Sequence, residues 1–139
     1  MRTVRDADGC RYVLLKESGE SSLVRDPESG EIRHVPNADL RPVEGESPLA
    51  TAARGVPGAV RRVLTAVPDE RALGLLLEIE ARGPVAVRDL QRSYDLCESD
   101  LHGLLAEFRA AGLVAETEVA GERGYDATET TREALEALG

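Results

Sequence analysis

The fold of this chain is decided by residues 73–114, which read LGLLLEIEARGPVAVRDLQRSYDLCESDLHGLLAEFRAAGLV. Apolar residues recur at helical spacing in three segments of this stretch. The first segment ends at Gly83-Pro84, and the second is short and centres on Leu90. The third contains Leu101–Phe108 and closes at Gly112, a typical C-cap glycine. With a turn at residues 96–98, the pattern predicts three helices, the last two joined as a helix-turn-helix.

The residues on either side extend this unit. Asp69 is placed to cap the first helix. After the third helix, Val114–Val119 and Tyr125–Thr128 read as strands that flank a glycine-bounded loop, Gly121–Gly124, with Arg123 at its tip. Thr130-Thr131-Arg132-Glu133 matches a capping box and predicts the start of a last helix. We therefore expect one domain over residues 69–139.

The N-terminal part reads differently. Residues 1–45 consist of short strand-like runs separated by turns such as Asp8-Gly9, which predicts a small antiparallel meander. Ser47-Pro48 then opens a helix, and Gly55–Gly58 interrupts it before a second helical piece. Residues 46–68 are thus expected to form a helical connector. The predicted class is α+β, because 139 residues can bury one core with a small added sheet.

The run Ala81–Leu90, followed by Asp95–Leu101 and then Leu105–Val114, resembles winged helix-turn-helix repressors of the ArsR, PadR and TrmB types. The resemblance implies a transcription regulator that binds double-stranded DNA, with the third helix as recognition helix and the hairpin as wing. It also implies a homodimer, since two subunits usually read two half-sites. The wide apolar surface expected on the helix from Leu73 to Ile79 is consistent with a subunit contact.

The same resemblance implies which residues would contact DNA. Ser99 and His102 on the third helix would touch base edges, and Arg109 would reach a phosphate from the end of that helix. The other arginines would hold the backbone, with the hairpin arginine entering a minor groove. The candidates are Arg61, Arg62, Arg88, Arg92, Ser99, His102, Gly103, Arg109 and Arg123. Three of these residues have a plain alternative. Arg61-Arg62 would also suit an exposed helix face paired with acids, and His102 would also suit a solvated surface.

Charge limits how such a protein would bind DNA. The net charge is −9, with 26 acidic residues against 17 basic ones, and Lys16 is the one lysine. This balance resembles proteins of salt-in halophiles, especially haloarchaea, although codon bias in a high-GC bacterium would also favour arginine over lysine. In a high-salt cytoplasm the repulsion between carboxylates and phosphates would fade, because the screening length falls to ~3 Å at 1 M salt. Specific binding would then depend on base contacts and shape.

The acidic residues leave a second function open. Glu98, Asp100 and Glu107 stand on the third helix, where basic or amide residues are more usual in DNA-binding relatives. The alternative is a protein-interaction module that docks on a transcription, replication or division factor. A basic surface beside the recognition helix would favour DNA, and an unbroken acidic one would favour a protein partner.

Other functional classes find no support in the sequence. No nucleophile motif or phosphate-binding glycine loop occurs, so we expect no enzyme and no cofactor. Cys10 and Cys97 lie far apart and are expected to be reduced, with Cys97 a helix cap or a buried thiol. Neither cysteine has ligand spacing to His34 or His102, so no metal site is expected. No apolar run approaches the ~20 residues that span a bilayer, and no leader is apparent, so we expect a cytoplasmic protein.

Overall fold

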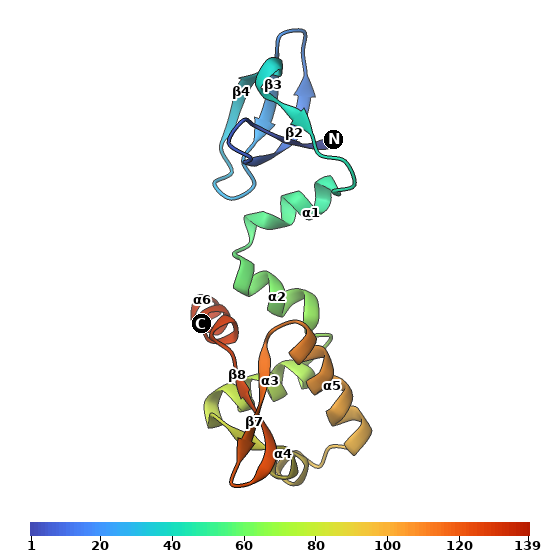
Figure 1. Cartoon of the computed structure of the whole chain (residues 1–139), viewed down its shortest axis with the longest axis vertical. Helices are drawn as coiled ribbons and strands as arrows, with labels where there is room; N and C mark the ends of the chain where they lie inside the picture. The colour runs from blue at the N-terminus through green and yellow to red at the C-terminus, as the bar shows by residue number, and fades with distance from the viewer. The chain divides into compact units, whose positions relative to one another are not determined.

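The computed structural model describes residues 1–139 (Figure 1) and divides them into two compact units, residues 1–57 and residues 58–139. The expected connector, residues 46–68, is therefore not a part of its own. Its first helix, α1 (Pro48–Ala52), belongs to the N-terminal unit, together with the short 3-10 turn η2 (Ala53–Gly55). Its second helix, α2 (Gly58–Ala66), belongs to the C-terminal unit.

The N-terminal unit is an antiparallel sheet, as expected for residues 1–45, and its strands appear with α1 in Figure 1. The strand order is β4-β3-β2-β1-β5, so the two-residue β5 returns to pair with β1. A 3-10 turn, η1, connects β4 to β5. The bounds are β1 Arg2–Arg5, β2 Arg11–Glu17, β3 Ser21–Arg25, β4 Ile32–Pro36, η1 Asn37–Asp39 and β5 Arg41–Pro42.

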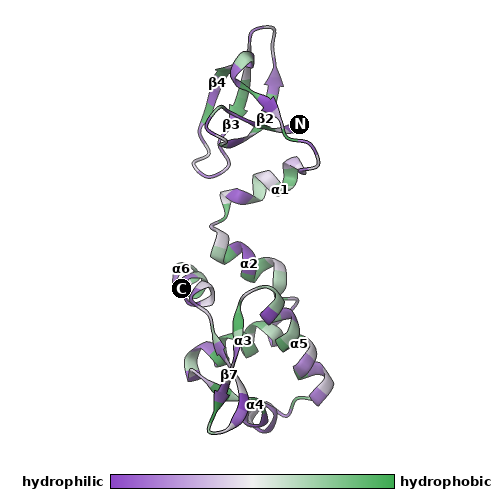
Figure 2. Ribbon diagram, viewed as in Figure 1, coloured by the Kyte–Doolittle hydropathy of each residue, from purple (hydrophilic) through white to green (hydrophobic).

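One face of this sheet holds a small core. Its buried members are Val4, Tyr12, Leu14, Val24 and Leu40. Figure 2 shows apolar and polar segments side by side within the strands. Thr3 and Val13, which pair on the other face of the sheet, are also buried, so that face is covered as well.

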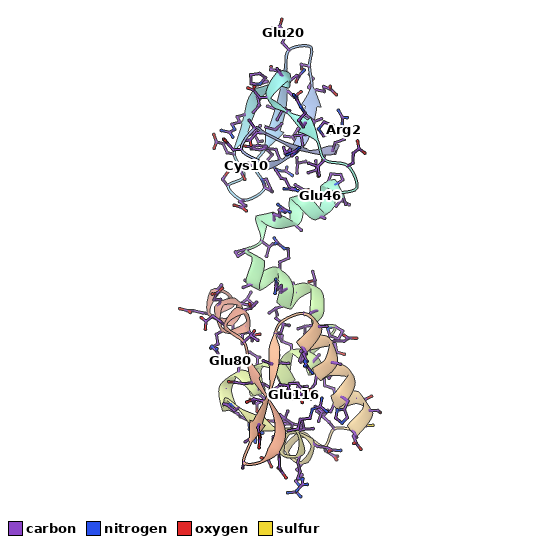
Figure 3. The ribbon with its side chains drawn as sticks, in the orientation of Figure 1. Arg2, Cys10, Glu20, Glu46, Glu80 and Glu116 are labelled. Atoms are coloured by element: carbon purple, nitrogen blue, oxygen red, sulfur yellow. The ribbon has the colours of Figure 1, made fainter.

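Helix α1 supplies that cover through polar contacts. The buried hydroxyls of Thr3 on β1 and Thr51 on α1 lie 2.6 Å apart. Thr51 also donates to Oε1 of Glu46 at 3.1 Å, and Glu46 accepts from Nε of Arg11, on β2, at 2.7 Å. The hydrogen bond from Arg11 holds the pKa of Glu46 below its usual value. Glu46 is labelled in Figure 3, just before α1. These bonds tie α1 to the N-terminal unit.

The C-terminal unit contains the helices and the hairpin expected from residues 69–139. Asp69 caps α3, accepting a hydrogen bond from the Ala72 amide at 2.8 Å. Gly83 follows α3 with φ 72°, and Gly112 follows α5 with φ 75°. Helix α2 packs beside the last helix, α6. The bounds are α3 Glu70–Arg82, β6 Val85–Ala86, α4 Val87–Tyr94, α5 Glu98–Ala110, β7 Val114–Val119, β8 Glu122–Ala127 and α6 Glu129–Leu138.

Two expected boundaries in this unit were wrong. The last helix begins at Glu129, because Thr128 and not Thr130 is its N-cap, and the side chain of Thr128 accepts from the Thr131 amide. Thr131 is buried instead and donates to the carbonyl of Leu113 at 2.6 Å. A capping box read two residues late therefore misplaced the helix start.

The hairpin turn was also misplaced. Val119 pairs with Glu122, so the turn is Ala120-Gly121, and both residues have positive φ, 50° and 81°. This is the geometry of a two-residue type I′ turn. Gly124 lies inside β8, where an added Cβ would stand 2.6 Å from the carbonyl oxygen of Val85. Arg123 consequently lies in a strand, next to α5, and not at the tip of the wing.

The core of the C-terminal unit comes from α3, α4, α5 and the start of the hairpin. Its largest fully buried side chains are Leu76, Ile79, Leu90, Leu101, Leu105, Phe108 and Leu113. On α3, part of the expected wide apolar surface is used inside this core, and Leu77 stays exposed. None of the helices is long and apolar enough to cross a membrane.

Candidate functional site

Helix α5 turns one side inward and offers the other to solvent. Leu101, Leu105 and Phe108 are buried, as expected from their spacing. The other residues from Ser99 to Arg109 lie on two flanks of the helix that differ in charge. Each flank lines its own groove, and the predicted site residues of α5 divide between the two.

The first groove lies between α5 and the hairpin. It encloses about 550 Å³, and three predicted residues line it: His102 and Arg109 from the helix, and Arg123 from β8. Ala106 and Ala110 line the helix side of the groove with small side chains, and Tyr125 lies beside Arg123. The register of β8 with β7 brings Arg123 here, although it is 14 residues beyond Arg109 in the sequence. The structure thus gathers cationic side chains from a helix and a hairpin at one place.

Glu116, on β7, joins the two arginines of this groove. Its Oε2 lies 2.8 Å from Nη1 of Arg109, and its Oε1 lies 3.0 Å from Nε of Arg123. Glu116 is labelled in Figure 3 within the C-terminal unit. Its carboxylate therefore offsets part of the positive charge that the arginines bring to the groove.

Arg123 has a second support in Tyr125. Its Nη2 donates to the Tyr125 hydroxyl at 2.8 Å, and its guanidinium lies 5.7 Å from the centre of the ring. The hydrogen bond to Tyr125 is also the main reason why the pKa of Arg123 is raised. A buried tyrosine thus holds the arginine in place beside α5.

The second groove lies on the opposite flank of α5, against the start of α3. It encloses about 430 Å³ and contains the predicted residues Ser99 and Gly103. The charged side chains around them are mostly acidic. The lining consists of Pro68, Asp69, Arg71, Ser99, Asp100, Gly103, Leu104 and Glu107. The structure therefore separates Ser99 and Gly103 from His102, which lies 3.6 Å from Glu98.

One arginine of α4, Arg88, extends to the hairpin. Arg88 pairs with Glu122, the first residue of β8, at 3.1 Å. Arg92 follows one turn later and is exposed, so the two arginines share a side of the helix. Arg88 therefore pairs with a glutamate of the same hairpin that supplies the partner of Arg109 and Arg123.

The arginine pair of α2 lies elsewhere in the same unit. Arg61 is half-buried and Arg62 is exposed. A Cβ added to Gly112 would lie 3.0 Å from Nη1 of Arg62, so this guanidinium rests against the backbone that ends α5. A cation at a helix C-terminus is favoured by the helix dipole. Arg62 thus has a structural role at the end of α5, in addition to its predicted contact with DNA.

Cys97 differs from the expectation of a cap or buried thiol. It occupies the N-cap position of α5, but its side chain makes no capping hydrogen bond and it is exposed. Its sulfur lies 3.1 Å from the Ser99 hydroxyl, and this hydrogen bond lowers the pKa of the thiol. Cys10 is also a free, exposed cysteine.

The sequence reasoning missed Glu116 and Tyr125. The signal was present, because alternation along a hairpin places residues 116 and 118 on the same face as residues 123 and 125. Using it required the correct turn. When the loop is placed at Gly121–Gly124, Arg123 lies outside the paired strands, and no cross-strand neighbour can be assigned to it.

Known proteins resemble this chain at two levels. A crystal structure of an ArsR family transcriptional regulator is similar at a TM-score of 0.46 and 18% identity, and the match covers 60% of this chain and 84% of that chain. Similarity this low assigns no function to the chain. No curated protein matches it. The model of a family of unknown function, DUF7346, matches residues 1–139, and the chain therefore belongs to that family.

Proposed function

We propose that residues 58–139 form a winged helix-turn-helix domain that binds double-stranded DNA, and that the protein is a transcription regulator. In this proposal α5 enters the major groove and the β7–β8 hairpin is the wing. The observation that carries it is the groove where His102 and Arg109 of α5 meet Arg123 of the hairpin. A recognition helix and a wing must act on one stretch of DNA, so their cationic side chains must converge.

The remaining candidates take roles that follow from their positions. Arg88 and Arg92 on α4 contact the DNA backbone beside the wing, and Arg61 and Arg62 on α2 contact it further along. Ser99 and Gly103 line the acidic groove on the other flank of α5, so in this proposal they make no contact with DNA.

Charge gives the proposal its conditions. Arg88, Arg109 and Arg123 each pair with a glutamate of the hairpin, and the whole chain has a net charge of −9. We therefore propose a cytoplasm of high salt as the working environment, since screening there weakens both attraction and repulsion. The composition, rich in acids with one lysine, supports that environment.

The active form in this proposal is a homodimer. Leu64 on α2 and Leu138 on α6 are 61% and 55% exposed, and they border an apolar groove with Val63, Val67 and Leu73. Exposed apolar patches of this kind often mark interfaces between proteins. A two-fold dimer would present two copies of α5 to two half-sites.

A second function is favoured by the other flank of α5. Asp69, Asp100 and Glu107 line the groove against α3, and DNA would be repelled there. In this alternative the acidic groove docks on a basic segment of a transcription, replication or division factor. The two functions use opposite flanks of one helix, so variants can separate them.

Fluorescence anisotropy of the full chain with duplexes selected from a random pool tests the proposal. His102→Ala combined with Arg109→Gln should weaken the selected duplex at least tenfold, because good base and phosphate contacts contribute about 1–3 kcal/mol each. The matched control is Arg71→Gln, which removes the same charge from the acidic groove on the opposite flank. DNA affinity should be nearly unchanged in this variant.

The contrary results are equally specific. If selection enriches no duplex at any salt concentration, the DNA-binding proposal is wrong. If a duplex binds and Arg71→Gln weakens it as much as the paired variant does, the hairpin flank of α5 is not the DNA face.

A further inference from the structure

We propose that Glu116 occupies a phosphate-binding position between α5 and the hairpin, and that a phosphate of the DNA backbone displaces it on binding. The inference rests on the proposed function, because it names the anion that the groove takes. It assigns to Glu116 the role of an internal competitor. The wild-type affinity for DNA is then set partly by a residue that does not touch DNA in the complex.

The geometry of the carboxylate is the first support. Each of its oxygens binds a different arginine, Arg109 at 2.8 Å and Arg123 at 3.0 Å. A phosphodiester also presents two charged oxygens on one atom, and arginine favours both groups for the same reason. Glu116 therefore stands where a backbone phosphate would make the same two contacts.

Accessibility is the second support. The side chains of Arg109 and Arg123 are 57% and 52% exposed, and that of Glu116 is 37% exposed. Ion pairs between such exposed groups are weak and screened by salt. The carboxylate can thus swing away without leaving a buried charge behind, and the arginines remain open to a ligand from the groove.

The third support is that one of the two cations stays in place when Glu116 leaves. Tyr125 is buried, accepts a hydrogen bond from Nη2 of Arg123 at 2.8 Å, and offers its ring to the guanidinium. The alanines of α5 that line the groove, Ala106 and Ala110, leave room for a phosphate to approach Arg109. The position is therefore partly preorganised for an anion.

The consequence is a specific change in binding when the carboxylate is neutralised. Glu116→Gln keeps an amide oxygen for one arginine but removes the competing charge. Since each exposed ion pair is worth no more than a factor of about five, DNA affinity should rise about three- to tenfold. The dependence of log K on log salt should steepen by up to about one unit, as for one more neutralised phosphate.

The control variant is Glu28→Gln, which makes the same charge change at an exposed turn of the N-terminal unit. We expect its affinity to change less than twofold and its salt slope to stay the same. Glu116→Ala serves as a second neutral variant, in case the amide disturbs the hairpin. Hairpin amide shifts in NMR spectra identify the variant that remains folded, and that variant should bind more tightly than wild type.

A second measurement separates this inference from the DNA proposal. Inorganic phosphate is titrated into the full chain without DNA, and the Nε–Hε signals of Arg109 and Arg123 are followed by NMR. In Glu116→Gln both signals should move at several-fold lower phosphate concentration than in wild type. If phosphate does this but no duplex is bound, the DNA proposal fails and the anion position stands.

The inference itself is overturned by either of two results. In one, a duplex binds and the folded neutral variants bind it no more tightly than wild type. In the other, phosphate moves neither arginine signal in Glu116→Gln. Loss of DNA binding in a folded neutral variant would show instead that Glu116 is needed to position the arginines.

Discussion

Replacing Thr51 by valine should destabilise the N-terminal unit selectively. The buried Thr51 hydroxyl lies 2.6 Å from the Thr3 hydroxyl and 3.1 Å from Oε1 of Glu46. A hydroxyl has one hydrogen, and an ionised carboxylate only accepts. The Ser47 carbonyl oxygen, 3.3 Å from the Thr51 hydroxyl, also only accepts, so Thr51 donates toward Glu46 and Ser47 and accepts from Thr3. The hydroxyls and Glu46 thus form a chain that runs from β1 through α1 to Glu46.

The magnitude follows from which group loses its partner. Thr51→Val leaves the buried Thr3 hydroxyl without its acceptor, which costs about 1–3 kcal/mol of the unfolding free energy. Thr3→Val leaves Thr51 still donating to Glu46 and should cost about 1 kcal/mol or less. The double variant replaces both hydroxyls by methyl groups of similar shape. It should be more stable than Thr51→Val alone, because no buried donor is left unsatisfied.

Native-state hydrogen exchange measures this effect in each unit separately, because amides report the local opening free energy. Protection should fall in β1–β3 of Thr51→Val and recover partly in the double variant. The amides of β7 and β8 serve as an internal control and should be unchanged. A double variant less stable than Thr51→Val, or equal loss of protection in both units, would refute the hydrogen-bond chain.

Three further predictions concern packing, pH and assembly. Gly124→Ala should lower the melting temperature markedly, because the added Cβ would stand 2.6 Å from a backbone oxygen. Gly74→Ala has open space around its Cβ and should instead stabilise α3 by up to about 1 kcal/mol. Equal effects of the two variants on the melting temperature would contradict the packing. Because the pKa of Glu46 is lowered in the folded state, its ionised carboxylate contributes stability at pH values above the ordinary carboxyl pKa. This stability is lost as the pH falls through the pKa of Glu46 in the folded protein. The urea midpoint of wild type should therefore drop on acidification, and it should drop less in Glu46→Gln. Light scattering in multimolar KCl should find a dimer that Leu64→Glu converts to monomer, and a monomeric wild type would contradict the homodimer.

Much of the architecture could be read from short-range patterns. The N-cap at Asp69, the glycines at 83 and 112 and the inward leucines of α5 were predicted from the sequence and are confirmed. Each depends on interactions within a few residues, which propensity and periodicity describe well. The predicted boundaries were wrong at the capping box and at the hairpin turn, where the local sequence fits more than one boundary.

The candidate site depends on longer-range facts. That His102 and Arg109 share a groove with Arg123, while Ser99 and Gly103 line another, is decided by which side of α5 the hairpin covers. The side that the hairpin covers depends on the register of β7 with β8, because a slip of one residue exchanges the two faces of a strand. No pattern within α5 contains this information.

The sequence by itself therefore determined the helix-capping residues at Asp69, Gly83 and Gly112, the inward leucines of α5 and the acidic balance of the chain. Only the tertiary structure decided that Glu116 stands between Arg109 and Arg123, and that α1 and α2 belong to different units. The physical reason is the range of the interactions. Caps and periodicity act along a few residues of chain, whereas ion pairs and buried hydroxyl contacts form only after packing has brought distant strands and helices together.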